Sequence, residues 1–535
     1  MKKTVILFLA VVLAIGMVFA GGGGQQSSGA GGQDDLSRHE KFTFATLNWG
    51  QIHGTEFNTD DVSQHLRKKF NFEWDVIQMT WADWIDRPRI WINSMDMPDL
   101  IWTDFNFNDY KNYAEQGLIK RFPSGWKQRY PNLAKVFNES MLGPELEKRV
   151  QGEQAIIPNI ASMMFKQTSP RLAHHMSIWF RKDWAQALGM PIKDHYTLKE
   201  FTAMVEKFNA QGSSLRGVTP GRTGPWNLST DRLGVFLETQ FVYALSFYKN
   251  DSGRYVWGPD DPQVFELVRY MKEAIDKGIV SPNFASYRNQ EEDVLFYNGQ
   301  AFAMYSHGWI EYAARFRNEF QAATGLDPFD CLHQAVLTDD KGLYQQVEQL
   351  NFWSCIYFNP KMSDAKFSRL LSLLDYIASP EGQDYIRLGF EGKDYTRNGN
   401  VINITRPRDS SGNFQDIMAM YPVTGILSHI TIVLDDFANR SPAIPQRYFE
   451  SVLNMFATKQ RIGVDTGTVR AYDFDYFFFD GPNKIKFPSA TNIMADIVRV
   501  AMMSGDLRTN YNNWLREMRP VVDPVLAELN TAFGR

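Results

Sequence analysis

Tryptophan residues in loop-like sequence are the side chains of this chain best suited to bind a ligand. Trp49 (NWG), Trp226 (GPWN), Trp257 (VWGPD) and Trp309 (HGWI) lie among Gly, Pro, Asn and Asp residues, which are typical of turns. A tryptophan ring can stack on the C–H face of a sugar, while neighbouring carboxylates and amides bond to its hydroxyl groups. The chain has 14 Trp, 22 Tyr and 39 Phe, so most of its aromatic rings must form cores instead.

A cluster of carboxylates suggests catalysis as a second kind of chemistry. Asp473, Asp475 and Asp480 (YDFDYFFFD) could supply the two carboxyl groups that a glycosidase needs at one bond. Their alternation with Phe and Tyr is more typical of a strand with a solvated face. His174 and His175 are adjacent, so on a regular element they point apart and make a poor metal pair. The chain has no HExxH, GxSxG or GxxxxGK[ST] motif, and we expect no catalytic residue, no metal and no cofactor.

Strands and helices alternate at the start of the mature chain. Residues 42–47 (FTFATL) alternate as a strand, residues 59–70 form an amphipathic helix, and residues 71–78 (NFEWDVIQ) form the next strand. Residues 100–102 follow Pro98 as a third, buried strand. This pattern predicts an α/β fold with a parallel sheet and a ligand crevice at the carboxyl ends of its strands.

The same alternation continues further along the chain. Thr197 and Glu200 have the spacing of a capping box for a helix over 196–208. Ser379 precedes Pro380, the order expected where a helix begins. The other segments that we predict are strands at 178–181 and 301–305 and helices at 182–188, 261–277, 293–298 and 363–377.

Charge and cysteine content exclude some classes of protein. The net charge of −5 and the pI near 6.0 give no electrostatic reason to expect nucleic acid as a partner. The two cysteines, Cys331 and Cys355, predict one disulfide if the chain is exported to an oxidising compartment, with two buried thiols as the alternative. A closed loop of about 25 residues would stabilise the fold by roughly 3 kcal/mol in the chain-entropy model.

The first 20 residues have the pattern of an export signal. Lys2 and Lys3 precede an apolar stretch over 5–18, and Val18-Phe19-Ala20 ends in the small residue that signal peptidase requires. Residues 21–35 are expected to form a flexible Gly/Ser/Gln linker. An uncleaved anchor is the alternative, although the apolar run is shorter than the roughly 18 residues of a spanning helix. No cysteine follows the cut site to carry a lipid, so we expect a cleaved, periplasmic protein.

Five segments, in order along the chain, resemble the extracellular solute-binding proteins (family 1) of carbohydrate ABC transporters. The resemblance is to the long-chain subgroup that includes alginate-oligosaccharide-binding proteins. SPEGQDYIRLGFEGKDYT, at 379–396, is the most specific of the five. The others are MPDLIWTD (97–104), RYPNL (129–133), IWFRKDWAQALGM (178–190) and FYNGQAFAMYSHGW (296–309). Relatives often carry a calcium loop that residues 208–220, which have no carboxylate, do not reproduce.

The resemblance implies a two-lobed periplasmic-binding-protein fold of type II, with a cleft between lobes that are joined by crossover strands. It places lobe one at 36–158 plus 335–400, and lobe two at 159–334 plus 401–535. Closure of the lobes over a sugar would be a hinge motion that distinguishes the loaded from the empty protein.

Residues expected near this cleft make up the predicted ligand site. Gly308 would let a ligand approach the backbone. Ordinary turn chemistry is the alternative for the strand-end residues, core packing for Trp353, and a structural turn near the hinge for the GFEGKDYT segment. The predicted residues are Asn48, Trp49, Thr103, Asp104, Trp226, His307, Gly308, Trp309, Trp353, Glu391 and Tyr395.

These observations predict a monomeric, non-catalytic carbohydrate receptor, with an oligosaccharide as ligand and ABC-transporter permease subunits as partners. An exported glycoside hydrolase or polysaccharide lyase is the alternative from another class. A binding lobe that reports to a membrane sensor is a third reading.

Overall fold

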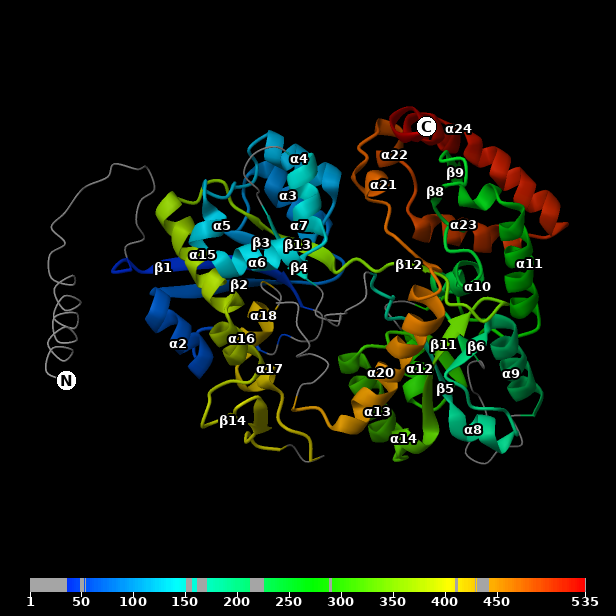
Figure 1. The fold of residues 1–535 in the computed structure, drawn as a ribbon, viewed down its shortest axis with the longest axis horizontal. Coiled ribbons are helices and arrows are strands. Elements are labelled where there is room, and N and C mark those ends of the chain that lie inside the picture. Colours follow the sequence, from blue (N-terminus) through cyan, green and yellow to red (C-terminus); the bar gives the residue numbers. More distant parts are fainter. Residues whose placement is uncertain are drawn as a thin grey trace, which may run out of the picture.

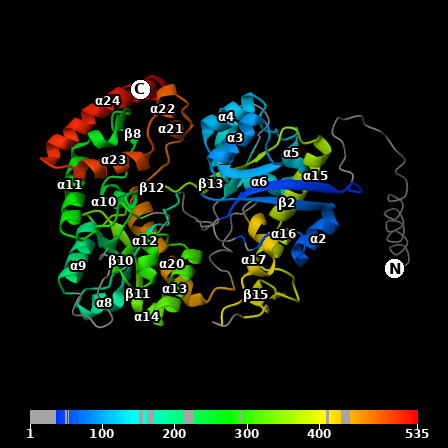
Figure 2. The same ribbon diagram turned by 180° about the vertical axis from the view of Figure 1, so that it is seen from behind.

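The structure is a computed structural model that describes residues 36–48, 52, 54–150, 156–160, 171–211, 226–287, 291–408, 412–428, 430 and 442–534. The chain forms two lobes that lie side by side in Figure 1 and, seen from behind, in Figure 2. Each lobe is built on one five-stranded sheet. No helix within these residues has the length and apolar character needed to cross a membrane.

The sheet of the first lobe contains three parallel strands and one strand that returns from much later in the sequence. β1 pairs in parallel with β2 and β3, and β13 is antiparallel to both β3 and β4. In spatial order the strands are β2 (Phe72–Met79), β1 (Glu40–Leu47), β3 (Leu100–Asp104), β13 (Phe352–Phe358) and β4 (Ile156–Ile160). The predicted strand–helix–strand start is therefore confirmed.

Local sequence explains how the first connection forms. The Asp60 side chain accepts a hydrogen bond from the backbone of Ser63 at the start of α2 (Asp61–Phe70), and Asn71 ends the helix with a left-handed backbone. Val62, Leu66 and Phe70 recur every four residues and are buried, so one face of α2 packs on the lobe.

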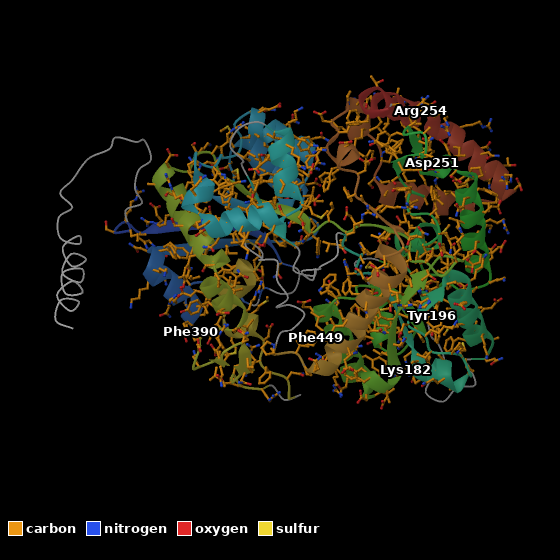
Figure 3. All side chains as sticks on the ribbon, in the orientation of Figure 1. Lys182, Tyr196, Asp251, Arg254, Phe390 and Phe449 are labelled. Atoms are coloured by element: carbon orange, nitrogen blue, oxygen red, sulfur yellow. The ribbon has the colours of Figure 1, made fainter. Side chains whose placement is uncertain are left out.

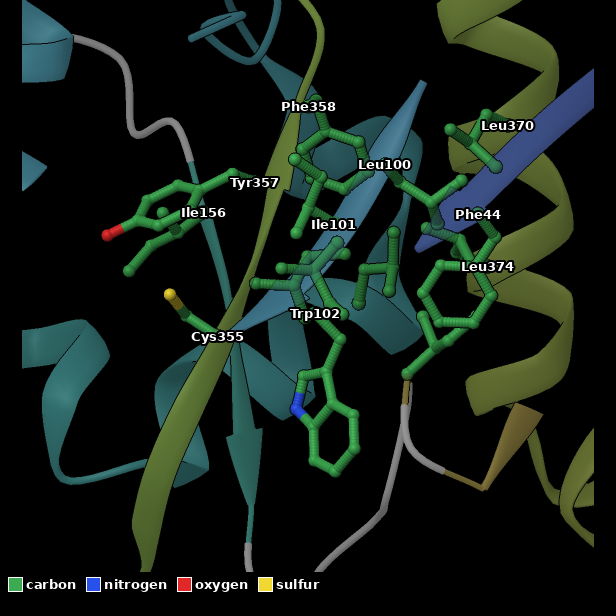
Figure 4. Packing of buried hydrophobic residues seen from close by; sticks show 14 of the residues in the cluster. Phe44, Leu100, Ile101, Trp102, Ile156, Cys355, Tyr357, Phe358, Leu370 and Leu374 are labelled. Carbon is green, nitrogen blue, oxygen red and sulfur yellow. The ribbon is translucent and has the colours of Figure 1, made fainter. Parts of the chain in front are cut away.

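Helices surround the sheet of the first lobe. Figure 4 shows Leu370 and Leu374 of α15 packed next to Phe44 and Leu100 of the sheet. Ser379 caps α16 as predicted. The helices are α2, α3 (Asp86–Ser94), α4 (Phe107–Glu115), α5 (Trp126–Arg129), α6 (Pro131–Glu139), α7 (Leu142–Arg149), α15 (Asp364–Ala378), α16 (Pro380–Arg387), α17 (Ile417–Met420) and α18 (Pro422–Leu427), with a hairpin of β14 (Tyr395–Asn398) and β15 (Val401–Ile404).

The sheet of the second lobe has one strand that runs opposite to the rest. β5 is antiparallel to both of its neighbours, β10 and β11, whereas β6 and β7 run parallel to the strands beside them. In spatial order the strands are β6 (His195–Thr197), β11 (Leu332–Thr338), β5 (Ser177–Arg181), β10 (Ala303–Ser306) and β7 (Trp226–Asn227).

Helices also cover the second lobe, which ends in the long α24. The capping box predicted for α9 is present, because Thr197 and Glu200 exchange hydrogen bonds of 3.0 and 3.1 Å. The elements are α8 (Lys182–Ala187), α9 (Leu198–Gln211), α10 (Val235–Glu238), β8 (Phe247–Lys249), β9 (Tyr255–Trp257), α11 (Pro262–Asp276), α12 (Glu291–Tyr297), α13 (Ile310–Thr324), α14 (Pro328–Cys331), α20 (Gln446–Lys459), α22 (Pro482–Ile485), α23 (Ala490–Met502) and α24 (Leu507–Phe533).

A small sheet and a short helix lie where the lobes meet. β12 (Gln346–Val347) pairs in parallel with β16 (Val469–Arg470). α21 (Phe474–Phe478) follows, with Phe478 in the core of the first lobe and Tyr476 against the core of the second. The strand predicted over Asp473, Asp475 and Asp480 is therefore wrong. Asp473 caps a helix instead, because its carboxylate accepts from the backbone of Tyr476.

The core clusters divide the chain differently from the predicted boundaries at two places. β11 (332–338) lies in the sheet of the second lobe, whereas the prediction begins lobe one at residue 335. Residues 417–430 belong to the core of the first lobe, whereas the prediction gives them to lobe two. In the first case the predicted boundary falls within β11, whereas the chain changes lobe only after this strand ends.

The predicted disulfide is wrong, because Cys331 and Cys355 are both buried free thiols. Cys331 ends α14 in the second lobe, and Cys355 lies in β13 of the first lobe. The two residues belong to separate hydrophobic clusters. Figure 4 shows Cys355 within the first core, near Tyr357.

Candidate functional site

The two sheets present corresponding edges to the crossover that joins them. β1, β2 and β3 end where β13 begins, as the pairs Leu47 with Met79 and Asp104 with Ser354 indicate. In the second lobe, β10 ends where β5 begins, because Ser306 pairs with Ser177. Residues 339–351 run from the end of β11 to the start of β13. We call the edge of each sheet at which these strands end its crossover edge. Side chains that follow parallel strands gather at such an edge.

Four tryptophans form a cluster at the crossover edge of the first lobe. Trp81 and Trp84 follow β2, Trp102 lies in β3, and Trp353 lies at the start of β13. The ring centroid of Trp353 is 4.8 Å from that of Trp84, 5.4 Å from that of Trp102 and 6.2 Å from that of Trp81. Trp81 keeps 53% of its surface exposed. We call these residues the tryptophan cluster, and it offers a flat apolar surface at the edge of the lobe.

Hydrogen bonds hold the rings of the tryptophan cluster in place. The Trp84 indole N–H donates to the carbonyl of Trp102 at 3.2 Å, and the Trp102 indole N–H donates to the Ser354 hydroxyl at 2.6 Å. The hydroxyl of Thr103 donates to the carbonyl of Trp84 at 2.9 Å. The exposed ring of Trp81 therefore rests on a fixed base.

A second aromatic cluster lies at the crossover edge of the second lobe. His307 and Trp309 follow β10, Tyr312 lies in the first turn of α13, and His175 precedes β5. The Trp309 centroid is 4.4 Å from that of His175, 4.7 Å from that of His307 and 4.5 Å from that of Tyr312. We call these four residues the histidine cluster. It combines apolar ring faces with polar ring edges.

The imidazoles near this edge are neutral at pH 7. Burial is the main cause that lowers the pKa of both His174 and His307 to about 3, and it lowers the pKa of His175 well below its usual value. Burial also lowers the pKa of Lys459 to about 7. The Lys459 ammonium donates to the carbonyls of His174 and Met176, which lie on either side of His175.

The crossover brings the two clusters close together. Gln349 contacts His175, and Trp353, only four residues later, belongs to the tryptophan cluster. Four extended residues span at most about 14 Å between Cα atoms. The two clusters are therefore joined by a short segment.

A buried acidic group adds to the polar character of the second edge. Glu311 lies between Trp309 and Tyr312, in the first turn of α13. Burial raises the pKa of Glu311 to about 7, and the charge of Arg387, from α16 of the first lobe, acts in the opposite direction. Within the described part of the chain, its Oε2 has no hydrogen-bond partner.

The strand-end residues predicted for the site lie in different surroundings. The Asn48 amide donates to the side-chain oxygen of Gln78 at 2.7 Å at the end of β1. Trp49 lies outside the described residues. Thr103 is buried and bonded to Trp84, as described above. Asp104 lines a small crevice with residues of α3 and α4, and burial raises its pKa to about 6.

One prediction for the second lobe needs correction. Trp226 is fully buried in the core of that lobe, where its ring lies 5.0 Å from that of Phe201, so its surroundings leave no room for a sugar. For Gly308, packing supplies a reason for the glycine, and the approach of a ligand to its backbone stays a prediction. A Cβ there would lie 2.5 Å from the carbonyl oxygen of His175 and 2.6 Å from the Ser177 hydroxyl.

Glu391 and Tyr395 do not join either cluster through any contact within the described residues. Tyr395 is 3% exposed, whereas Glu391 is exposed and forms a β-bridge with it. Lys393 between them pairs with Asp61 at 2.5 Å, at the start of α2. Figure 3 places Phe390, the residue before Glu391, in the lower part of the first lobe.

Sequence reasoning missed Trp81, Trp84 and His175. Trp81 and Trp84 form a WADW segment directly after the predicted strand over 71–78, and this position was the available signal. The His174 and His175 rings do not point apart, since their planes stack with centroids 4.6 Å apart. The reason is that this pair lies before β5 and not in a regular element.

No metal site is evident among the described residues. They contain no group of three His, Cys, Asp or Glu side chains placed to hold a metal ion.

A cavity of about 500 Å³ lies between α4 and α7 of the first lobe and α21 of the interlobe region. Two ion pairs cross between the lobes beside it. Lys111 pairs with Asp480, and Arg149 pairs with Asp475 at 3.1 Å. Glu115 and Arg121 also line the cavity, and the Arg121 guanidinium donates to the carbonyl of Ala114 at 2.7 Å.

Comparison with known proteins shows the fold. No protein-family model matches the chain, and no curated protein matches its sequence. The alginate-binding protein AlgQ2, in a structure without calcium ion, is 14% identical, with a TM-score of 0.64 over 94% of this chain and 99% of that one. FusA, an ABC-transporter substrate-binding protein of S. pneumoniae in complex with kestose, is 14% identical, with a TM-score of 0.64 over 92% and 98%.

A third neighbour has the same architecture. It is an extracellular solute-binding protein from Bifidobacterium longum subsp. infantis, 11% identical, with a TM-score of 0.63 over 93% of this chain and 99% of that one. The chain therefore has the two-lobed binding-protein fold, as predicted. Its first sheet has the order β2–β1–β3–β13–β4, in which one late strand is inserted.

Proposed function

We propose that this chain is the carbohydrate-binding component of an ABC importer, and that it binds an oligosaccharide between its lobes without catalysing a reaction. The observation that carries the proposal is the pairing of the tryptophan cluster with the histidine cluster, one at the crossover edge of each lobe. Its fold neighbours include an alginate-binding protein and a substrate-binding protein in complex with kestose.

The two clusters have the chemistry that sugar binding needs. The exposed Trp81 ring can stack on the C–H face of one sugar unit, and Trp353 extends this surface toward the crossover. The ring edges of the histidine cluster and the carboxyl of Glu311 can exchange hydrogen bonds with hydroxyl groups. A ligand that contacts both lobes would favour their closed arrangement, because it binds that arrangement more tightly.

The hydrolase or lyase alternative receives little support from the carboxylates. Asp473 caps α21 and accepts from the Tyr255 hydroxyl at 2.7 Å. Asp475 pairs with Arg149 and Lys249, and Asp480 pairs with Lys111. These groups are held by cations and backbone at the lobe boundary, whereas a glycosidase needs two carboxyl groups that face one bond.

Export and partners complete the proposal. The pattern of residues 1–20 supports secretion with cleavage after Ala20 and residence in the periplasm. The proposal takes the protein to act there as a monomer. The importer's permease subunits would then recognise the loaded, closed protein. N-terminal sequencing of protein from the native host would test the cleavage, which predicts Gly21 as the first residue.

A ligand panel tests the function itself. We expect at least one oligosaccharide to raise the thermal midpoint, because a ligand at 100 times its Kd adds about 2.7 kcal/mol of stability. A suitable panel contains the neutral trisaccharides maltotriose, cellotriose, mannotriose and kestose, and the acidic trisaccharides of alginate and polygalacturonate. Incubation with the bound sugar should release no new reducing ends and no unsaturated products. Turnover would favour the hydrolase or lyase, and the absence of any binding would contradict the proposal.

A further inference from the structure

A single oxygen atom sets the hydrogen-bond direction in the histidine cluster. The side-chain oxygen of Gln349 lies 3.1 Å from the backbone nitrogen of His175 and 2.8 Å from its ring Nδ1. A backbone N–H can only donate, so the Gln349 atom it meets must be the amide oxygen. That oxygen can only accept. The Nδ1 of His175 must therefore carry the proton.

The tautomer of His175 determines which ring donates in its hydrogen bond with His307. A neutral imidazole carries one proton, so His175 with a protonated Nδ1 has a bare Nε2 that accepts. This Nε2 lies 2.9 Å from Nδ1 of His307. His307 must then donate from Nδ1, which leaves its own Nε2 as an acceptor.

The Nε2 edge of His307 has no hydrogen-bond partner among the residues that the structure describes. Among the described residues, the hydrogen bonds of His307 are those of its Nδ1 and of its backbone carbonyl, which accepts from the Trp179 indole. The His307 residue is half-buried, and its Nε2 is not among the fully buried atoms that lack a partner. An acceptor therefore lies beside the rings of Trp309 and Tyr312, whose centroids are 4.7 and 4.3 Å from that of His307.

The backbone around this pair of rings is held firmly. The Lys459 ammonium donates hydrogen bonds to the carbonyls on both sides of His175. Gly308 packs so closely against His175 and Ser177 that there is no space for a side chain. Gln334 donates to the carbonyl of Gly308 at 3.0 Å. The backbone at His175 and at Gly308, the residue after His307, is therefore fixed.

Burial is the main reason that the pair stays neutral. Burial, followed by the charge of Arg232, opposes protonation of His307 and lowers its pKa to about 3. For His175 the main cause is again burial, followed by His174 and His307. The acceptor character of Nε2 is thus retained at neutral pH.

We propose that His307 Nε2 accepts a hydrogen bond from a hydroxyl group of the ligand, and that His175 and Gln349 act as positioning residues that hold the required tautomer. A hydroxyl can donate this bond, whereas an ionised carboxylate has no proton to give and would face a lone pair. The position therefore takes a hydroxyl group of the sugar and not a carboxylate group. This inference rests on the proposed function and names the chemical group of the ligand that this edge binds.

The first experiment measures the tautomer without any ligand. Protein labelled with ¹⁵N in its histidine rings is studied by long-range ¹H–¹⁵N correlation NMR at pH 7, and a His307→Gln variant assigns the resonance. We expect a protonated Nδ1 and a bare Nε2 for His307, and a mixture of tautomers in Gln349→Leu. A proton on Nε2 of His307 in the parent protein would overturn the inference, whatever the protein binds.

The second experiment measures binding by calorimetry with the six trisaccharides of the panel. We expect at least one of the six to bind. His307→Leu should weaken the tightest of them about tenfold or more, because a hydroxyl in the site loses its acceptor. His307→Gln, whose amide oxygen can replace Nε2, should retain most of the affinity, and Gln349→Leu should fall between the two.

The outcomes separate the inference from the function. A His307→Leu variant that is folded and binds normally would overturn the inference and leave the proposed function intact. If none of the six trisaccharides binds, the proposed function fails and the claim that His307 binds a sugar hydroxyl fails with it. Circular dichroism and the thermal midpoint of each variant confirm that it is folded.

Discussion

Gln349 and Trp353 lie four residues apart on one crossover, yet each contacts the aromatic cluster of a different lobe. Gln349 accepts from His175 of the second lobe, and Trp353 packs against Trp84 of the first. The crossover therefore does more than connect the sheets, because its side chains belong to both candidate binding surfaces. A change in the angle between the lobes would alter the spacing of these surfaces near this segment.

Trp81 should contribute strongly to binding and little to stability. Replacing it with Ala removes the exposed stacking surface of the tryptophan cluster, so we expect the affinity for the tightest trisaccharide to fall about thirtyfold, or about 2 kcal/mol. The free energy of unfolding should change by less than about 1 kcal/mol, because the ring is half exposed. Calorimetry and thermal melts measure the two effects. Ile90→Ala, on exposed α3, is the matched control and should alter neither. Normal binding by the Trp81 variant would exclude this ring from the site.

Trp309 needs a milder substitution than its loop-like sequence indicates. The sequence predicts an exposed ring that could be removed without harm to the fold, but Trp309 is 8% exposed and packs on His175, His307 and Tyr312. We expect Trp309→Ala to lower the free energy of unfolding by about 3 kcal/mol or more. Trp309→Phe keeps an aromatic ring and should cost clearly less. Denaturant unfolding measures both, and equal stability of Trp309→Ala and the parent would show that the ring is not part of the packing.

Local patterns predicted much of the fold. The period-two strand at 42–47, the helix at 59–70 and the cap at Ser379 depend on neighbours in sequence, and each occurs within a few residues of its predicted place. The lobe boundary depends instead on the sheet with which a strand pairs. The apolar strand β11 is compatible with either sheet. Its pairing with β5 and β6 places it in the second lobe.

The candidate site was less predictable because its contacts join distant segments. His175 and His307 are 132 residues apart, and Trp102 reaches Ser354 across 252 residues. Gly, Pro and Asn neighbours suggested loops for Trp226 and Trp257, yet both rings fill the core of the second lobe. Turn residues describe the backbone around a tryptophan. They do not determine whether its ring points toward solvent or toward the core.

Both cysteines should titrate as free thiols. The protein denatured without reductant should give two equivalents with a thiol reagent, because Cys331 and Cys355 are free and lie in separate cores. The native protein should react slowly, since burial raises the pKa of Cys331 to about 11 and that of Cys355 still further. Reductant should leave the thermal midpoint unchanged. A drop in the midpoint with reductant, together with no free thiol, would restore the disulfide.

Asp104 should make stability depend on pH in the acidic range. Burial raises its pKa in the folded protein to about 6, whereas in the unfolded chain it ionises near its ordinary value of about 4. Between these values the folded state binds more protons than the unfolded state. The free energy of unfolding therefore falls as pH rises from about 4 to about 6, and this contribution is constant above that range.

Replacing Asp104 with Asn removes this cost of ionisation. We expect Asp104→Asn to exceed the parent in free energy of unfolding by about 2 kcal/mol at pH 7.5, and by much less at pH 4, since a shift of one pKa unit corresponds to about 1.4 kcal/mol. Asp96→Asn, at an exposed carboxyl of the same lobe, controls for the change in net charge and should show no such difference between the two pH values. Urea unfolding at pH 4, 5, 6 and 7.5 measures the effect. An equal or lower stability of Asp104→Asn at pH 7.5 would show that the ionised carboxylate is stabilised by its crevice, and would restore Asp104 as a polar group available to a ligand.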